Sequence, residues 1–153
     1  MFSKILVAID GSKTADRAVE FALDLAGKYS AELLIVSVFY VISTPLVARG
    51  MGFSSPSTTK QIEELGSFHE KILVDAVKKA KQVNGKLKVT KKLMNGPVAH
   101  KIVETANNGQ FDLIVIGNRG LGGIKEIFLG SVSDRVVDEA KCPVLIVKEN
   151  NIS

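Results

Sequence analysis

The glycines and hydroxyl side chains between residues 117 and 133 form the stretch best suited to binding a ligand. Its key residues are, in chain order, Gly117, Gly120, Gly130, Ser131 and Ser133. Two residues separate the first two glycines, and nine separate the second from the third. Glycines let a backbone approach a ligand closely, and the first N–H groups of a helix lack partners within the helix. Because an apolar run precedes this stretch and a helical pattern follows it, we predict a phosphate site here.

The same glycines could also serve only the backbone. Gly120 would then lie in a flexible turn, and Gly130 with Ser131 would be a helix start with a serine cap. Two better-known phosphate motifs are excluded. No Gly-Lys-Ser or Gly-Lys-Thr closes the stretch, and Lys125 stands where a dinucleotide fingerprint needs its third glycine. As a set placed after a strand, the glycines favour the phosphate interpretation.

The elements that would position this stretch alternate regularly along the chain. Apolar or alternating runs predict strands at 5–9, 33–38, 87–93, 112–116 and 144–147. Helical spacing predicts helices over 15–26, 58–83, 97–108 and 131–140. Five strands alternating with four helices are typical of an α/β protein with a mostly parallel sheet.

Several local signals set the ends of these elements. Ser12 is expected to cap the first helix, and Thr58 with Gln61 can form a capping box for the second. Pro97 is expected at the first position of the third helix, where its missing N–H is harmless. The segment 39–57 is the least regular part of the chain, and a loop of this length is usually functional or mobile.

The composition is that of a single globular domain over residues 1–153. The chain is 46% hydrophobic and 24% charged, and no apolar run reaches the roughly 20 residues of a membrane span. No signal peptide is visible, so we expect a cytoplasmic protein. The lone Cys142 excludes an internal disulfide and is expected to be a small buried hydrophobe. His69 and His100 are expected on helix surfaces or half-buried, and we predict no metal cluster.

The net charge of +4 raises the question of nucleic-acid binding. Residues 60–92 carry nine lysines against four acids, but this segment has no arginine and only one aromatic residue, Phe68. Nucleic-acid surfaces usually combine their charge with arginine or stacking aromatic side chains. We therefore interpret the segment as a solvated helix face and predict no nucleic-acid partner.

Three separated motifs give the chain a resemblance to a known family. They are the glycine spacing described above, the opening run ILVAIDGS at 5–12 and the closing run CPVLIV at 142–147. Together they resemble the ATP-binding branch of the universal stress protein (UspA-like) family over nearly the whole chain. The resemblance implies a three-layer, Rossmann-like fold of the adenine nucleotide alpha hydrolase type, with a parallel sheet of order 3-2-1-4-5. Asp10 and Gly117 would then end the two strands beside the reversal, where ligands bind in such sheets.

The resulting hypothesis is that this crevice binds ATP, with contacts from residues near both ends of the chain. The predicted contacts are Ala8, Ile9, Asp10, Val38, Ile116, Gly117, Arg119, Gly120, Gly130, Ser131, Val132 and Ser133. Phosphates would rest on backbone N–H groups of the glycine stretch, with Arg119 or the Ser133 hydroxyl assisting. Asp10 would hold a ribose hydroxyl or a phosphate-bound Mg²⁺, or else cap the following helix.

The remaining apolar positions have simpler expected roles. Val38 matches the family position that faces adenine. Ala8, Ile9 and Ile116 are wall candidates that could equally be plain core. No convincing general base accompanies the site, so the chain is predicted to be a nucleotide-dependent regulator with at most slow hydrolysis.

Two other functions are alternatives to ATP-dependent regulation. An ATP pyrophosphatase would carry a Ser-Gly-Gly-x-Asp-Ser loop after the first strand, but this chain has Asp10-Gly11-Ser12. A dimeric interaction module without nucleotide is the other alternative. In either family branch, the apolar run Val144, Leu145, Ile146 and Val147 would lie at a sheet edge and is expected to pair with a second copy.

Overall fold

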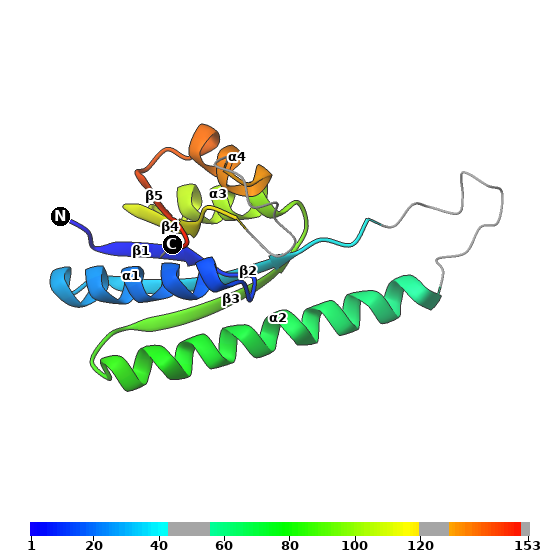
Figure 1. Ribbon diagram of the computed structural model, residues 1–153, viewed down its shortest axis with the longest axis horizontal. Helices are drawn as coiled ribbons and strands as arrows, with labels where there is room; N and C mark the ends of the chain where they lie inside the picture. Colours follow the sequence, from blue (N-terminus) through cyan, green and yellow to red (C-terminus); the bar gives the residue numbers. More distant parts are fainter. Residues whose placement is uncertain (43–55, 120–128, 151–153) are drawn as a thin grey trace.

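Five parallel strands and four helices make up the computed structural model, which describes residues 1–42, 56–119 and 129–150 (Figure 1). The elements are β1 (Lys4–Ala8), α1 (Lys13–Tyr29), β2 (Glu32–Phe39), α2 (Pro56–Val83), β3 (Val89–Asn95), α3 (Val98–Asn108), β4 (Leu113–Gly117), α4 (Ser131–Glu139) and β5 (Val144–Val147). This alternation of strands and helices confirms the α/β class expected from the hydrophobic pattern.

The strand order is β3-β2-β1-β4-β5, and every neighbouring pair is parallel. In the centre of the sheet, Leu6 of β1 stands opposite Leu34 of β2 on one side and Ile114 of β4 on the other. The order of the strands reverses between β1 and β4, as the resemblance implied. The carboxyl ends of these two strands therefore open on the same crevice.

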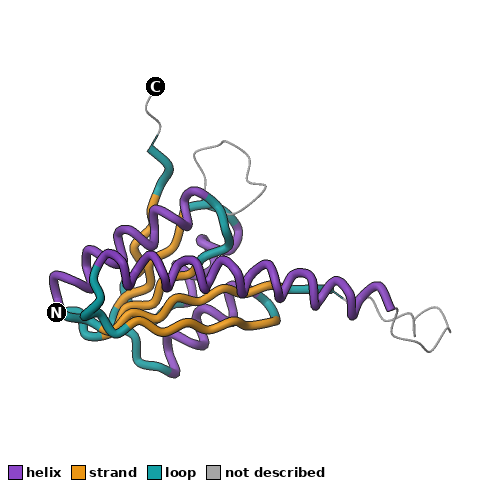
Figure 2. Tube along the Cα trace, turned by 90° about the horizontal axis from the view of Figure 1, so that it is seen from below, coloured by secondary structure: helices purple, strands orange, loops and turns teal. Residues whose placement is uncertain are grey.

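Helices cover both faces of the sheet, with α1 and α2 on one side and α3 and α4 on the other (Figures 1 and 2). Side chains of β1 alternate between the two layers. Ile5 and Val7 join the core under α1 and α2, while Leu6 and Ala8 join the core under α3 and α4. Because both faces are covered, the central strands read as continuous apolar runs.

The N-terminal part of α2 extends beyond the sheet as a projecting arm (Figures 1 and 2). Ile62 and Leu65 lie toward this end of the helix and are 37% and 38% exposed, while Phe68, 44% exposed, lies at the base of the arm beside the turn at Gly11. The same apolar stripe continues to Leu73 and Ala80, which are fully buried where the helix lies over the sheet. Of the irregular segment expected at 39–57, residues 43–55 lie outside the described part of the chain.

The ends of the helices agree with the sequence signals in part. The predicted capping box of Thr58 with Gln61 is wrong, because α2 already begins at Pro56 and Thr58 lies within the helix. Ser12 caps α1, because its hydroxyl oxygen accepts the backbone N–H of Ala15 at 3.2 Å. Pro97, however, is the N-cap of α3 and not its first helical residue: its ψ of 118° is not helical, and the helix begins at Val98. The error arises because a proline φ of −56° suits either position.

Cys142 is half-buried against the core beneath α3 and α4. Burial raises the pKa of its thiol, because an apolar setting disfavours the thiolate. Cys142 therefore packs as a small hydrophobic residue, but it is half-buried and not fully buried as expected, and a reactive thiol is not supported.

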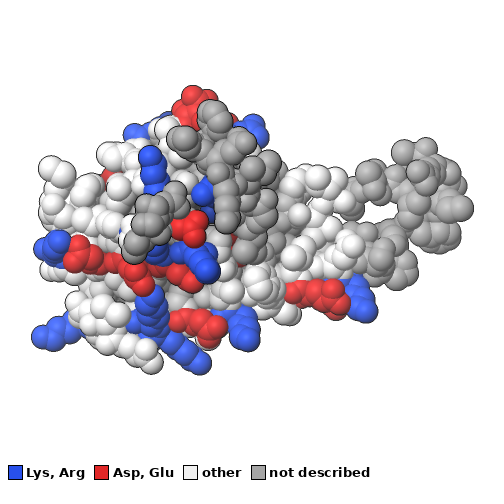
Figure 3. Space-filling view, viewed as in Figure 1, with Lys and Arg blue, Asp and Glu red and all other residues white. Residues whose placement is uncertain are grey.

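Acidic and basic side chains are interspersed over the face shown in Figure 3. Within the described ranges, lysines of the 60–92 segment form four ion pairs with acids: Lys60–Glu64, Lys79–Glu20, Lys88–Glu32 and Lys91–Glu70. Such pairing suits a solvated surface, and the absence of a nucleic-acid partner stays a prediction. A search of the described residues for a helix long and apolar enough to cross a membrane finds none.

Candidate functional site

The turn after β1 and the end of β4 are in direct contact, as the strand order requires. The Thr14 hydroxyl donates a hydrogen bond of 2.5 Å to the backbone carbonyl oxygen of Arg119. Gly117 is in close contact with Thr14, because a Cβ atom placed on Gly117 would lie 2.6 Å from the Thr14 hydroxyl oxygen. Glycine is therefore required at 117 because two backbone segments, more than a hundred residues apart in sequence, pass closely here.

The two ends of the glycine stretch also meet each other. The backbone N–H of Gly130 donates to the carbonyl oxygen of Asn118 at 2.7 Å. A Cβ atom on Gly130 would lie 3.2 Å from that oxygen and 3.4 Å from Cα of Arg119. We call this contact of residues 118 and 119 with Gly130 the neck of the stretch. Gly120, a predicted contact, lies beyond the neck and outside the described residues.

The start of α4 offers backbone donors next to the neck. Gly130 is the N-cap, and the helix has no side-chain cap. The first intrahelical bond runs from the N–H of Asp134 to the Gly130 carbonyl, so the N–H groups of Ser131, Val132 and Ser133 precede the helical ladder. Together with the positive end of the helix dipole, these groups suit an anion.

Ser133 is placed differently from the prediction. Its side chain is buried, and its hydroxyl donates to the Gly117 carbonyl oxygen at 2.6 Å. Since a hydroxyl has a single proton, donation to a phosphate would require this bond to break. The Ser133 side chain therefore links α4 to the end of β4. Only the backbone N–H of Ser133 is then available to bind an anion at the helix start.

Asp10 organises the turn after β1. Its Oδ1 atom accepts the backbone N–H of Ser12 at 2.9 Å, and Ser12 in turn caps α1. The carboxylate thus supports the N-cap residue and is not itself the cap, which corrects the alternative role considered above. Among the described residues, no cluster of three His, Cys, Asp or Glu side chains could hold a metal ion. A contact of Asp10 with Mg²⁺ bound to a ligand stays a prediction.

Arg119 is mostly buried at the neck, with 16% of its side chain exposed. Its guanidinium lies 3.9 Å from the carboxylate of Glu149, which follows β5. This loose pairing holds the cation near the crevice, where its charge adds to the positive end of α4.

The four apolar residues predicted to line the crevice are buried. Ala8, Val38 and Ile116 belong to the core under α3 and α4, and Ile9 belongs to the opposite core. Their side chains therefore contribute to packing, and any contact with a ligand at these positions would fall mainly on the backbone at the strand ends.

Asn118 is a residue that the sequence analysis missed. It is 9% exposed, and its Oδ1 atom has no hydrogen-bond partner among the described residues. A buried acceptor left in this way calls for a donor from a bound group or water. Asn118 directly follows β4 and forms part of the neck, so this unsatisfied acceptor lies at the crevice.

The expectation that His69 lies on the surface or is half-buried is wrong, because it is buried. It is 8% exposed, and its Nδ1 lies 2.6 Å from the Ser37 hydroxyl, which donates to the Ile9 carbonyl oxygen at 2.7 Å. The ring is also packed between those of Phe39 and Phe68. Burial lowers the pKa of His69, and the nearby Asp10 carboxylate opposes this shift.

The hydrogen bonds of His69 connect α2, β2 and the end of β1 in one chain. Because Ser37 donates to Ile9, the Nδ1 atom must carry a proton and donate to Ser37. Nothing in a single histidine on a helical pattern signals this, since its partners are 32 and 60 residues away. The exposed His100, by contrast, lies on the surface of α3 as expected.

Comparisons with known proteins give one consistent result. A model of the universal stress protein family matches residues 1–148. Universal stress protein YxiE of Bacillus subtilis is 37% identical over 150 residues, covering 97% of this chain and 100% of that protein. The solved structure of MJ0577 from Methanocaldococcus jannaschii has a TM-score of 0.82 at 25% identity and covers 99% of each chain. A universal stress protein solved in complex with cAMP is 28% identical with a TM-score of 0.67, covering 96% of this chain and 97% of that chain.

Proposed function

The chain belongs to the universal stress protein family, and from this premise we propose that it is an ATP-binding regulator of the stress response. The observation that carries the proposal is the glycine neck beside the uncapped start of α4, opposite the turn of Asp10. A relative solved with cAMP supports an adenine nucleotide as the ligand class. A cytoplasmic location remains part of this proposal.

The residues present fit a nucleotide in three respects. Because Gly130 has no side chain, the start of α4 can lie directly beside the backbone that follows β4, so its backbone donors lie at the crevice. The backbone N–H groups of Ser131, Val132 and Ser133 would hold phosphate oxygens, with Arg119 adding positive charge. The buried Oδ1 of Asn118 has no donor within the described part of the chain, and a ribose hydroxyl or an adenine amine would supply one.

Asp10 would serve the sugar or the metal. A carboxylate repels phosphate directly but accepts hydrogen bonds from ribose hydroxyls, and Mg²⁺ joins carboxylates to phosphates. One oxygen already holds the Ser12 N–H, so the other is the candidate ligand atom. The backbone of Val38, at the end of β2, would face the adenine.

The protein is proposed not to be primarily an enzyme. Hydrolysis of ATP needs a positioned water and a group that orients it, and Asp10 is the only carboxylate among the predicted contacts. Since Asp10 already holds the turn before α1, any turnover is expected to be slow. A nucleotide-free interaction module with the same fold is the alternative, and the two proposals differ in whether the crevice is occupied.

The test is to identify what the purified protein carries. Mass spectrometry after denaturation should detect an adenine nucleotide, and titration calorimetry of stripped protein should show binding of ATP in the presence of Mg²⁺. Parallel titrations with ADP, AMP and cAMP rank the ligands. Absence of binding by all four would contradict the proposal and favour the interaction module.

A substitution at the neck tests the location of the site. Gly130→Val should abolish nucleotide binding, because a branched side chain cannot fit 3.2 Å from the Asn118 carbonyl without displacing the start of α4. Gly27→Val is the matched control: it lies on α1, and a Cβ atom there meets only Asn84, at 3.9 Å. If Gly130→Val remains folded by circular dichroism and keeps full affinity, the nucleotide binds elsewhere.

A further inference from the structure

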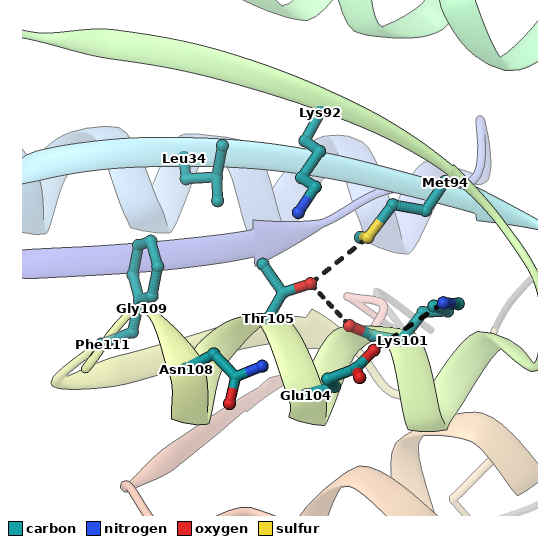
Figure 4. Close-up of a pocket in the computed structure, with 9 residues that line it drawn as sticks. All are labelled: Leu34, Lys92, Met94, Lys101, Glu104, Thr105, Asn108, Gly109 and Phe111. Carbon is teal, nitrogen blue, oxygen red and sulfur yellow. Dashed lines mark hydrogen bonds and ion pairs between the residues drawn. The ribbon is translucent and has the colours of Figure 1, made fainter.

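A groove of about 540 Å³ lies on the α3 side of the sheet (Figure 4). Side chains of β2 and β3 form one wall, α3 forms the other, and Phe111 closes one end. Its volume is within the range of about 300–1,000 Å³ that small-molecule sites occupy. None of the residues predicted to bind nucleotide contributes to it.

The groove lies over the edge strand β3 and its neighbour β2, beside α3. On β3, Lys92 and Met94 point to this face, while Lys91 pairs with Glu70 of α2 on the other.

The floor of the groove is apolar and firmly held. Leu34, Met94 and Phe111 are partly buried against the core under α3 and α4, so each presents its remaining surface to the groove. The Phe111 ring is fixed by Lys4, whose Nζ lies 4.7 Å from the ring centroid. It also packs on Gly109, where a Cβ atom would approach the ring to 2.5 Å. A rigid apolar floor suits a hydrophobic ligand body.

The rim carries an excess positive charge. Lys92 extends from β3 toward α3 (Figure 4), and it has no ion-pair partner within the described ranges. Lys101 is opposed by Glu104, whose carboxylate lies 3.7 Å from its Nζ. The Thr105 hydroxyl donates to the Lys101 carbonyl oxygen at 2.7 Å, so it has no proton left to donate to a ligand. Lys92 is therefore the group that would select the charge of the occupant.

We propose that this groove binds a small organic monoanion with an apolar body, such as a medium-chain carboxylate. The anion pairs with Lys92, and its apolar part lies over Leu34, Met94 and Phe111. A dianion is less suited, because the carboxylate of Glu104 balances the second lysine. The groove adjoins the end of β2, because Met94 pairs with Val38 in the sheet. None of its lining residues is a predicted nucleotide contact, so the proposal does not require ATP binding.

The experiment uses octanoate as the probe and the whole chain labelled with ¹⁵N. Octanoate should shift the backbone amides of Leu34, Met94 and Phe111 in a saturable way. Two control compounds should each bind at least about fivefold more weakly than octanoate. Acetate has the negative charge but no long alkyl chain, and octylammonium has the alkyl chain but a positive charge. Equal binding of octanoate and octylammonium would overturn the proposal, as would shifts confined to the exposed arm at Ile62 and Leu65.

Charge reversal at the rim provides the second test. Lys92→Glu should weaken octanoate binding at least about fivefold, because it replaces an attraction with a repulsion. Lys81→Glu makes the same change in net charge on the exposed surface of α2 and should leave the affinity unchanged. Lys92→Met should weaken octanoate but not octan-1-ol. If Lys92→Glu and Lys81→Glu behave alike, Lys92 does not select the ligand and the proposal fails.

Discussion

Gly117 is held by a contact that leaves no space for a side chain. The close neighbour is Thr14, whose hydroxyl oxygen would lie 2.6 Å from a Cβ atom at 117, with the Thr14 Cβ and carbonyl carbon each at 3.0 Å. We expect Gly117→Ala to lower the free energy of unfolding by about 1–3 kcal/mol, the usual cost of overpacking a tight site. Urea denaturation of the two proteins measures the difference.

The control for this substitution is Gly27→Ala. A Cβ atom at 27 has ordinary space, and alanine is the better helix former by about 0.5–1 kcal/mol, so this variant should be as stable as the parent or more so. Equal stability of Gly117→Ala and the parent would mean that Thr14 can move away without cost, and the contact would not explain the glycine.

Residue types at the crevice were partly predictable. The spacing of Gly117 and Gly130 identified them, because glycine after a strand and before a helix marks close backbone approach. Thr14 and Asn118 were missed, since threonine and asparagine are ordinary residues in turns and caps. Their importance comes from partners across the crevice, such as the Arg119 carbonyl for Thr14, and only the folded arrangement reveals such partners.

At the scale of elements, the central strands were the most predictable part. β1 and β4 are buried on both faces, so they read as unbroken apolar runs, and the predicted ranges agree with the structure to within a residue or two. β3 was harder, because it is an edge strand with exposed lysines. Its predicted start at residue 87 precedes the observed one by two residues.

Helix α2 was predicted as one long amphipathic helix. The sequence did not predict that its apolar stripe is exposed near the N-terminus and buried near the C-terminus. The apolar stripe continues through Ile62 and Leu65, although the sheet ends before it reaches them. A periodic pattern identifies which face of a helix is apolar, and it does not identify what covers that face. His69 lies at the base of this exposed part and ties the helix to β2 through Ser37.

The buried His69 makes the anchoring of α2 sensitive to pH. Burial lowers its pKa in the folded protein below the ordinary value of 6.5. Above that value both the folded and the unfolded chain have a neutral imidazole, and the stabilisation is complete. As the pH falls below it, the unfolded chain takes up a proton that the folded chain resists, so stability is lost until the folded pKa is passed.

We therefore expect the stability of the parent protein to decrease between pH 7 and pH 5, and the decrease to be smaller in His69→Gln. Glutamine keeps a donor for Ser37 but does not titrate. Urea denaturation at several pH values in this range measures both slopes. Carboxylates with lowered pKa values, such as Asp112, act at lower pH and are common to both proteins. Identical slopes would show that His69 does not couple protonation to folding.

At the scale of the whole molecule, β5 leaves one edge of the sheet exposed. β5 is bonded to β4 on one side, and no described strand pairs with its other side. Val144, Leu145 and Ile146 are half-exposed, which leaves an apolar edge of the kind that pairs with another chain. We propose that two copies pair through this strand across a two-fold axis, as the sequence and the family resemblance led us to expect.

The alternation of β5 indicates which substitution would separate the copies. The carbonyl groups of Pro143 and Val147 accept hydrogen bonds from β4 and the residue after it. Successive residues of a strand direct their backbone groups to alternate sides, so the N–H of Ile146 points to the open edge. Ile146→Pro removes that outward donor and spares the bonds to β4. By light scattering at micromolar concentration, the parent should have about twice the 16.4 kDa mass of one chain, and the variant about once that mass. Ile62→Ser, on the exposed arm of α2, is the control and should remain a dimer. A monomeric parent, or a dimeric Ile146→Pro that retains its circular dichroism spectrum, would place the contact elsewhere or remove it altogether.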